Sequence, residues 1–352
     1  MRVLILYTEL AAYLTSCLKH FVNQNKNAKI LLVHYPINKE APFLFNLPES
    51  IDKQEFNLIN LDVIHQKIEQ FEPQVILCSG WGNKHYLKWV KKYYNLAETV
   101  LCFDNQWQGK PKQWLLRLIS PFWIKKLFKK VWVPGIPQQN YAIKLGFEFG
   151  QISLGFYVAD TDIFKPIGTN KLMTKGDFPK TMVSVARYIP QKDLPTLWNA
   201  FIKANENTGS NWVLKCMGLG DLFDERIQNE YIHHLGFKQP EELREILKSS
   251  GVYILPSIYE PWGVAVHEAA LSAMPLILSN KIGSGSMFLT SENGFSFMVS
   301  DAQELQIYLE KIMTMNDESL WKMSQKSYDL AIQLTLDDWG KCLNKLGNTC
   351  AE

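Results

Sequence analysis

The sequence predicts an α/β protein made of two Rossmann-like domains, each built on a parallel sheet. Short apolar runs alternate with longer stretches of helical periodicity, which is typical of parallel strands joined by crossover helices. The alternation stops near the middle of the chain and then starts again. With 352 residues, of which 47% are hydrophobic and 20% charged, the chain is long enough for roughly two globular domains.

The expected strands and helices of the first half follow one another in strict alternation. The strands lie at 2–6, 29–33, 74–78, 99–103 and 130–134. The helices lie near 9–25, 60–70, 83–95, 112–129 and 137–146. In the second half we expect strands at 181–186, 211–217, 252–256 and 275–279, and helices near 193–205, 239–249 and 262–273.

The middle of the chain breaks this rhythm. Residues 157–180 are rich in Pro, Gly, Thr and Asp and show no sustained period, so we expect a linker there. We place an N-terminal domain at 1–165 and a C-terminal domain at 166–325. The pattern of 318–347 predicts further helix at the end of the chain.

Composition limits the class of protein. The N-terminal apolar run is interrupted by Glu9, so we expect a first strand there rather than an export signal. No stretch approaches the roughly 18 apolar residues that a spanning helix requires. The six cysteines have no spacing typical of a zinc site and favour reduced thiols in an intracellular protein; they are Cys17, Cys78, Cys102, Cys216, Cys342 and Cys350.

The nine residues EPWGVAVHE (260–268) follow one of the expected strands and open a helix. Glu260 therefore lies in a loop at the carboxyl edge of a parallel sheet, where ligands bind in open α/β folds. The backbone N–H groups of Gly263 and Val264 lie at the helix N-terminus, which suits a phosphate. Glu268 lies between one and two turns into the helix. Because a carboxylate accepts hydrogen bonds from adjacent hydroxyls, this pattern favours a nucleoside diphosphate sugar.

Four further segments extend this pattern. They are VARYIPQKD (185–193), MGLGD (217–221), GSGSMFLTSENGFSF (283–297) and DTDIFKP (160–166). With EPWGVAVHE they resemble the retaining GT-B glycosyltransferases of family 4, also called group 1, over most of residues 130 to 300. One departure is Ala186, where the family usually has Gly.

The resemblance implies a GT-B fold, in which two Rossmann-like domains face a cleft and a C-terminal helix, here within 326–352, crosses back to the first domain. It implies that Arg187 and Lys192 bind the donor diphosphate and that Glu268 holds the ribose. Glu260 would lie by the donor sugar, and Gly218 would belong to the same donor site. In the family's front-face reaction the leaving phosphate helps to deprotonate the acceptor, so the resemblance implies that no strong side-chain nucleophile is required. We expect no cofactor and no metal requirement.

Three other motifs have competing interpretations. Gly218-x-Gly220 matches part of a dinucleotide fingerprint, but Phe223 occupies the position of its third glycine. Asp160-Thr161-Asp162 mimics a metal-binding motif, and we expect no metal because it falls in the expected linker. His267 lies in an apolar helix, which favours packing over catalysis.

The N-terminal domain matches the family less well. YTELAAYLTS (7–16) stands where the family has a glycine-rich loop. At the carboxyl ends of the third and fourth expected strands, His85, Asp104 and Asn105 are the polar candidates for acceptor contacts. Helix capping and turn formation explain these three residues equally well.

Residues 106–147 contain eight Lys or Arg and no Asp or Glu, although the whole chain has a net charge of only +2. Around Pro121, aromatic and aliphatic residues recur at helical spacing between basic ones. This pattern of 110–130 suits an anionic membrane surface, and ordinary packing against the sheet explains it as well. Nucleic-acid binding is a less economical interpretation.

The sequence therefore predicts a cytoplasmic, retaining hexosyltransferase at the inner face of the plasma membrane. It would move a sugar from a nucleotide donor to a glycan or a lipid-linked acceptor in surface polysaccharide biosynthesis. Two alternatives stay open: a non-catalytic subunit of the same fold that binds a nucleotide sugar, and a nucleotide-sugar epimerase.

Overall fold

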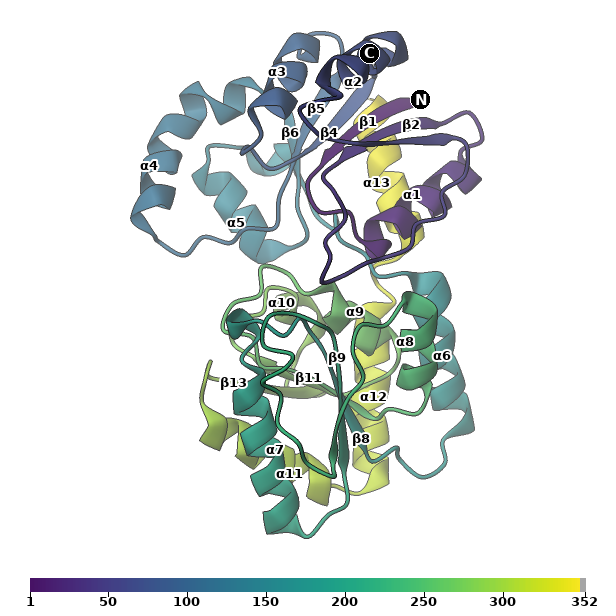
Figure 1. Cartoon of the computed structure of the whole chain (residues 1–352), viewed down its shortest axis with the longest axis vertical. Helices are drawn as coiled ribbons and strands as arrows, with labels where there is room; N and C mark the ends of the chain where they lie inside the picture. Colours follow the sequence, from purple (N-terminus) through teal and green to yellow (C-terminus); the bar gives the residue numbers. More distant parts are fainter. Residues whose placement is uncertain (349–352) are drawn as a thin grey trace. The chain divides into compact units, whose positions relative to one another are not determined.

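The computed structural model describes residues 1–348, so Cys350 lies outside the described part, and it divides the chain into two compact units (Figure 1). Unit 1 comprises Met1–Asn38, Phe43–Val158 and the described chain from Leu334 onward. Unit 2 comprises Lys39–Pro42 and Ala159–Gln333. The chain therefore contributes residues 39–42 to unit 2, enters it again at Ala159 and returns to unit 1 at Leu334.

Unit 1 contains a seven-stranded parallel sheet in the order β3-β2-β1-β4-β5-β6-β7. Its strands are β1 (Arg2–Tyr7), β2 (Lys29–His34), β3 (Ile51–Glu55), β4 (Val75–Ser79), β5 (Glu98–Cys102), β6 (Lys130–Trp132) and β7 (Ile152–Ser153). The order reverses direction beside β1, as in the doubly wound fold. The first strand therefore lies in the middle of the sheet, where it is buried on both faces.

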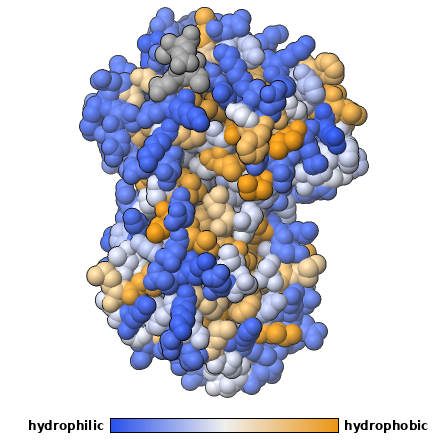
Figure 2. All heavy atoms as spheres, turned by 180° about the vertical axis from the view of Figure 1, so that it is seen from behind, coloured by the Kyte–Doolittle hydropathy of each residue, from blue (hydrophilic) through white to orange (hydrophobic). Residues whose placement is uncertain are grey.

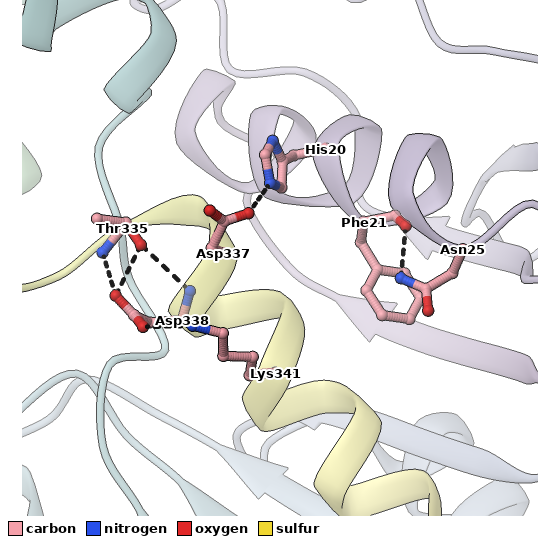
Figure 3. Close-up of polar contacts among 7 residues, drawn as sticks. All are labelled: His20, Phe21, Asn25, Thr335, Asp337, Asp338 and Lys341. Carbon is pink, nitrogen blue, oxygen red and sulfur yellow. Dashed lines mark hydrogen bonds and ion pairs between the residues drawn. The ribbon is translucent and has the colours of Figure 1, made fainter.

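The helices of unit 1 are α1 (Ala12–Gln24), α2 (Leu61–Phe71), α3 (Lys84–Tyr93), α4 (Pro111–Ile119), α5 (Ile136–Lys144) and α13 (Leu336–Asn348). Side chains of α2, α3 and α5 share one core cluster with alternate residues of the central strands, such as Leu4 and Leu6. The chain's last helix, α13, packs beside α1 (Figure 3).

The contact between α1 and α13 combines a polar edge with an aromatic centre. His20 of α1 pairs with Asp337 at 2.7 Å, and Asp338 accepts hydrogen bonds from Thr335 at the start of α13 (Figure 3). Trp339 is 1% exposed, packs against Trp132 with the two rings tilted by 34°, and donates its indole N–H to the Phe156 carbonyl at 3.0 Å. A tryptophan buried with its N–H satisfied holds this helix firmly in unit 1.

Unit 2 contains a six-stranded parallel sheet in the order β10-β9-β8-β11-β12-β13. Its strands are β8 (Thr181–Val185), β9 (Val213–Met217), β10 (Ile232–His234), β11 (Val252–Leu255), β12 (Leu276–Ser279) and β13 (Gly294–Phe297). Its helices are α6 (Thr161–Thr174), α7 (Leu194–Thr208), α8 (Pro240–Lys248), α9 (Val264–Leu271), α10 (Gly285–Phe288), α11 (Ala302–Thr314) and α12 (Asp317–Ala331). The strand order reverses between β8 and β11, which makes their carboxyl ends the switch point of this sheet.

The expected linker at 157–180 is wrong, because α6 occupies most of it. Asp160 caps this helix by accepting hydrogen bonds from the N–H groups of Asp162 and Ile163 at 3.1 and 3.3 Å. Gly168 permits close packing, since a Cβ there would lie 2.2 Å from the Leu271 carbonyl oxygen at the end of α9. Contact with α9, rather than helical propensity, stabilises this segment despite Pro166.

Lys171 of α6 links this helix to the ends of α8 and α9. Its amine is buried and donates to the carbonyls of Ser250 at 2.5 Å and Ser272 at 3.2 Å, just after the ends of α8 and α9. Burial lowers the pKa of Lys171 to about 7. A lysine in this place satisfies two helix-terminal carbonyls that would otherwise be buried without donors.

Two expected helices are shorter than predicted. The helix near 112–129 ends at Ile119 and is followed by two single 3₁₀ turns, Ser120–Phe122, which contains Pro121, and Ile124–Lys126. The helical segment at 318–347 is two helices, α12 and α13, separated at 332–335. The helix α4 ends before Pro121 because a proline has no N–H to donate to the preceding turn.

The described residues contain no helix long and apolar enough to cross a membrane. The five cysteines of this part of the chain carry free thiols, and Cys17, Cys78, Cys102 and Cys216 are buried. Burial raises the pKa of Cys216 to about 12, which makes this thiol unreactive.

Candidate functional site

The predicted functional residues of the second half gather at the switch point of unit 2. β8 is followed by Arg187 and Lys192, and the neighbouring strand β11 is followed by Glu260. Because parallel strands end at the same edge of a sheet, the two loops lie next to each other. Segments almost 70 positions apart in the sequence thus form one site.

An ion pair between Lys192 and Glu260 joins the two loops. The Lys192 side chain is 12% exposed and that of Glu260 is 14% exposed, so the pair is enclosed. Gln191 strengthens the junction, since its carbonyl accepts from the Ile258 N–H at 2.8 Å and its side-chain amide donates to the Tyr259 carbonyl at 2.6 Å. The loops after β8 and β11 are therefore held as one unit.

The Glu260 backbone is fixed from the opposite side. Its N–H donates to the Lys281 carbonyl at 3.1 Å, and its carbonyl accepts from the Gly283 N–H at 3.0 Å. Gly263 then turns the chain into α9 with φ of +90°, and a Cβ there would lie 2.9 Å from the Glu260 side chain. Only glycine combines this backbone angle with so close an approach.

The N-terminus of α9 begins at this glycine. Since Gly263 has no side chain, no side chain of this residue caps the helix. The Val266 N–H donates to the Gly263 carbonyl at 3.1 Å, so the amides of Gly263 and Val264 are the donors at this end that suit a ligand or solvent. The helix dipole adds positive potential at the same end. Gly263 and Val264 therefore offer the backbone geometry of an anion site.

Glu268 lies one turn further along α9 and is partly buried. Burial raises the pKa of Glu268 to about 7, and the negative charge of Asp160 acts in the same direction. Asp160 therefore lies near Glu268 and caps α6. The argument that Asp160-Thr161-Asp162 falls in a linker is wrong. Within residues 1–348, no three His, Cys, Asp or Glu side chains form a cluster that could hold a metal.

The MGLGD turn supports the β8 loop from the other side. Gly218 and Gly220 have φ of +142° and +152°, and a Cβ on Gly218 would lie 2.0 Å from the Ala186 carbonyl oxygen. Backbone hydrogen bonds from Ala186 to Met217 and from Tyr188 to Leu219, both 2.9 Å, hold the two loops together. Gly218 thus shapes the loop that carries Arg187 and accommodates Ala186 as its neighbour.

Arg187 has a different environment from Lys192. Its guanidinium contacts the Glu40 carboxylate at 3.3 Å, and the two side chains are 40% and 30% exposed. Glu40 belongs to the short segment Lys39–Pro42 of unit 2. No sequence pattern pointed to this residue, because it lies far from every motif and outside any expected element.

His267 has a structural role, as its apolar helix suggested. It is fully buried, its Nδ1 accepts from the Ala159 N–H at 3.2 Å and its Nε2 donates to the Ala331 carbonyl at 3.0 Å. Its ring stacks on Phe288 at 4.4 Å, and burial lowers its pKa to about 4. The interpretation of His267 as a packing residue is confirmed.

The three acceptor candidates lie in unit 1. His85 is in the first turn of α3, which is capped by Asn83, and Asp104 and Asn105 follow β5. Tyr13 and Tyr157 were missed by the sequence interpretation; their ring centroids lie 5.0 Å apart, and the Asp104 charge acts on both hydroxyls. The sequence showed both tyrosines, but nothing in their spacing placed them near Asp104.

Part of unit 2 matches a protein-family model. Residues 173–330 match the model of the family described as "Glycosyl transferases group 1". This range contains Arg187, Lys192, Gly218, Glu260 and Glu268. The site of unit 2 therefore lies wholly inside the matched region.

Curated relatives match part of the chain. Sucrose-phosphate synthase 1 of Arabidopsis thaliana is 28% identical over 162 residues, which is 40% of this chain and 15% of that protein. An uncharacterized glycosyltransferase of Methanocaldococcus jannaschii is 28% identical over 123 residues, 34% of this chain and 32% of that protein. The matches thus span only a minor part of each relative's length.

Solved structures match the fold over the full chain. A glycosyltransferase from Rickettsia africae has a TM-score of 0.74 at 13% identity and covers 100% of this chain and 98% of its own. HepE of Anabaena, in complex with UDP and glucose, has a TM-score of 0.69 at 13% identity over 97% of this chain and 98% of its own. These likenesses confirm the expected GT-B fold class with its two parallel sheets.

The raised pKa of Glu268 makes a prediction about stability. Because its folded pKa of about 7 lies above the ordinary carboxyl value, the native state binds the proton more tightly. Its contribution to the free energy of unfolding is therefore lost as pH rises through 7. We expect Glu268→Gln, which cannot ionise, to gain stability relative to the wild type between about pH 5 and about pH 8.

Denaturant unfolding at both pH values measures this difference. Glu241→Gln on α8 is the matched control, since Glu241 is exposed. If Glu268→Gln changed the free energy of unfolding equally at both pH values, the account of Glu268 would be contradicted.

Proposed function

Because the chain belongs to the group 1 glycosyl transferases, we propose that it transfers a hexose, with retention of configuration, from a nucleoside diphosphate sugar to a glycan or a lipid-linked acceptor. The reaction would take place in the cytoplasm during surface polysaccharide biosynthesis. The observation that carries the proposal is the enclosed Lys192–Glu260 pair beside the uncapped N-terminus of α9. A cation and backbone amides there suit the pyrophosphate of a nucleoside diphosphate sugar, and a carboxylate suits the hydroxyls of its sugar.

Each residue of the site has a distinct task in donor binding. The pyrophosphate would lie against the amides of Gly263 and Val264, where the helix dipole favours negative charge. Lys192 has three N–H donors, so it can hold Glu260 and a phosphate oxygen together. Glu268 would accept hydrogen bonds from the ribose hydroxyls, and Glu260 from hydroxyls of the donor sugar.

Transfer would follow the front-face route. The bond between the anomeric carbon and the phosphate oxygen breaks, and the acceptor oxygen forms its bond to the same face of that carbon. The acceptor's proton passes to the leaving phosphate, so no side chain serves as nucleophile or base. Glu260 fits this scheme because its charge is already balanced by Lys192. Arg187 and Lys192 would stabilise the charge that develops on the departing phosphate.

His85, Asp104 and Asn105 stay candidates for contacts with the acceptor. Their positions after β4 and β5 are where ligands bind to sheets of this kind. We add Tyr13 and Tyr157 to this proposed set, because their hydroxyls lie near Asp104.

The transferase proposal predicts that Lys192→Ala lowers turnover by about a hundredfold or more, since it removes a cation from the developing phosphate charge. Donor consumption with a panel of UDP, GDP and ADP sugars measures the effect. Lys322→Ala on α12 is the control, because Lys322 is exposed and lies outside the site. NMR of the product anomer should show retention.

Full activity of Lys192→Ala would contradict the assignment. Nucleotide-sugar binding without transfer or hydrolysis would instead favour a non-catalytic subunit, and a change of sugar configuration without transfer would favour an epimerase.

We further propose that residues 110–130 contact an anionic membrane surface. None of the residues of α4 is buried, and Leu116 alone among its apolar side chains packs partly against the core of unit 1. The others face outward: Trp114, Leu115, Leu118 and Ile119 are 50%, 60%, 69% and 41% exposed. Packing against the sheet, the competing interpretation, does not account for these exposed side chains.

Basic residues lie among the exposed apolar ones. Lys110, Lys112 and Arg117 belong to α4 or precede it, and the guanidinium of Arg117 lies 5.2 Å from the Trp114 ring. Figure 2 shows hydrophobic side chains in orange beside blue ones along the right edge of unit 1, the side of α4 in this view. Apolar groups that insert and cations that attract lipid phosphates suit the anionic surface.

Vesicle binding tests the membrane proposal. We expect the chain to sediment with vesicles that contain phosphatidylglycerol at low salt and to stay in solution with pure phosphatidylcholine, because the attraction is electrostatic. Leu118→Glu should weaken binding severalfold. Leu96→Glu, at a residue 72% exposed elsewhere in unit 1, is the matched control. Equal binding to both lipids, or none to either, would refute the proposal.

A further inference from the structure

The contact between Glu40 and Arg187 has no role in the proposed reaction, and it puts an acid where the donor's phosphate would bind. Glu40 lies in Lys39–Pro42, a segment that groups with unit 2 although the residues on both sides belong to unit 1. The contacts that tie the segment to unit 2 include the Glu40–Arg187 ion pair and a hydrogen bond from the Gln239 amide to the Pro42 carbonyl at 3.0 Å.

A carboxylate and a phosphate compete for the same donors of a guanidinium. Arg binds either anion best through two parallel N–H···O bonds. Here the structure has one contact at 3.3 Å between Nη1 of Arg187 and Oε2 of Glu40. The remaining donors of the guanidinium are therefore not committed to this carboxylate, and an incoming phosphate can take its place.

The two ion pairs of the site differ in how firmly they are built. Lys192 and Glu260 are enclosed, and the Glu260 backbone is held by Lys281 and Gly283. Glu40 and Arg187 are 30% and 40% exposed, and water screens such a pair strongly. Glu260 is thus a fixed part of the site, whereas Glu40 comes from a separate segment and its pair with Arg187 is exposed to water.

We propose that Glu40 is an internal competitor of the donor diphosphate for Arg187 and thereby sets the affinity for the donor. The inference rests on the proposed function, since it assigns Arg187 to the diphosphate. Binding the donor requires Arg187 to leave the Glu40 carboxylate, and that carboxylate then repels the phosphate while it stays nearby. Both effects weaken donor binding, and both disappear when Glu40 loses its charge.

Glu40→Gln tests the competition directly. We expect this variant to bind a nucleoside diphosphate about two- to fivefold more tightly than the wild type at low salt, a small gain because the pair is exposed. The gain should shrink at high salt, where screening weakens both the ion pair and the repulsion. Isothermal titration with UDP, GDP and ADP measures both quantities.

Two controls separate competition from a merely structural effect. Glu49→Gln changes an exposed acid of the same connection between β2 and β3 and should leave affinity unchanged. In an Arg187→Ala background, Glu40→Gln should give no gain, since the competitor has lost its target.

Unchanged or weaker binding by Glu40→Gln would overturn the inference and leave the proposed function standing. A gain that persisted without Arg187 would also overturn it, because the effect would then not pass through the guanidinium. If none of the three nucleotides bound to the wild type or to any variant, the proposed function would fail and the inference with it.

Discussion

The ion pair between Lys192 and Glu260 is the interaction on which the rest of the site depends. It joins the loops after β8 and β11 at the place where the strand order of the sheet reverses. An enclosed ion pair is stable only when each charge keeps its partner, since removing one side chain leaves the charge of the other uncompensated. In the proposed function the pair would also bind the donor, because it presents a lysine and a carboxylate in fixed positions next to the N-terminus of α9.

Glycines make this arrangement geometrically feasible. Gly263 lets the chain turn into α9 directly against the Glu260 side chain, and Gly218 lets the β9 loop approach the Ala186 carbonyl. A larger residue at either position would move the loop that carries a charged group. The proposed function therefore depends on backbone geometry as much as on the charged side chains.

Most of the fold could be predicted from the sequence, because central parallel strands are continuous apolar runs. The edge strands β3 and β10 were not predicted, because β3 has the sequence IDKQE and β10 has only three residues, so neither contains an apolar run. α6 was missed because Pro166 and Gly168 hide a helix that contact with α9 stabilises. The motif residues of the site were found by the position of EPWGVAVHE after a strand and by the family resemblance, whereas Glu40 and the coupling of Asp160 to Glu268 arise only from tertiary contacts.

The account's central claim concerns where a diphosphate binds. A structure of the chain with a bound nucleoside diphosphate tests it most directly. We expect the pyrophosphate within hydrogen-bonding distance of the Gly263 and Val264 amides and of the Lys192 amine, with Glu268 on the ribose. A nucleotide bound elsewhere in unit 2, with Lys192 still paired to Glu260 alone, would contradict the account.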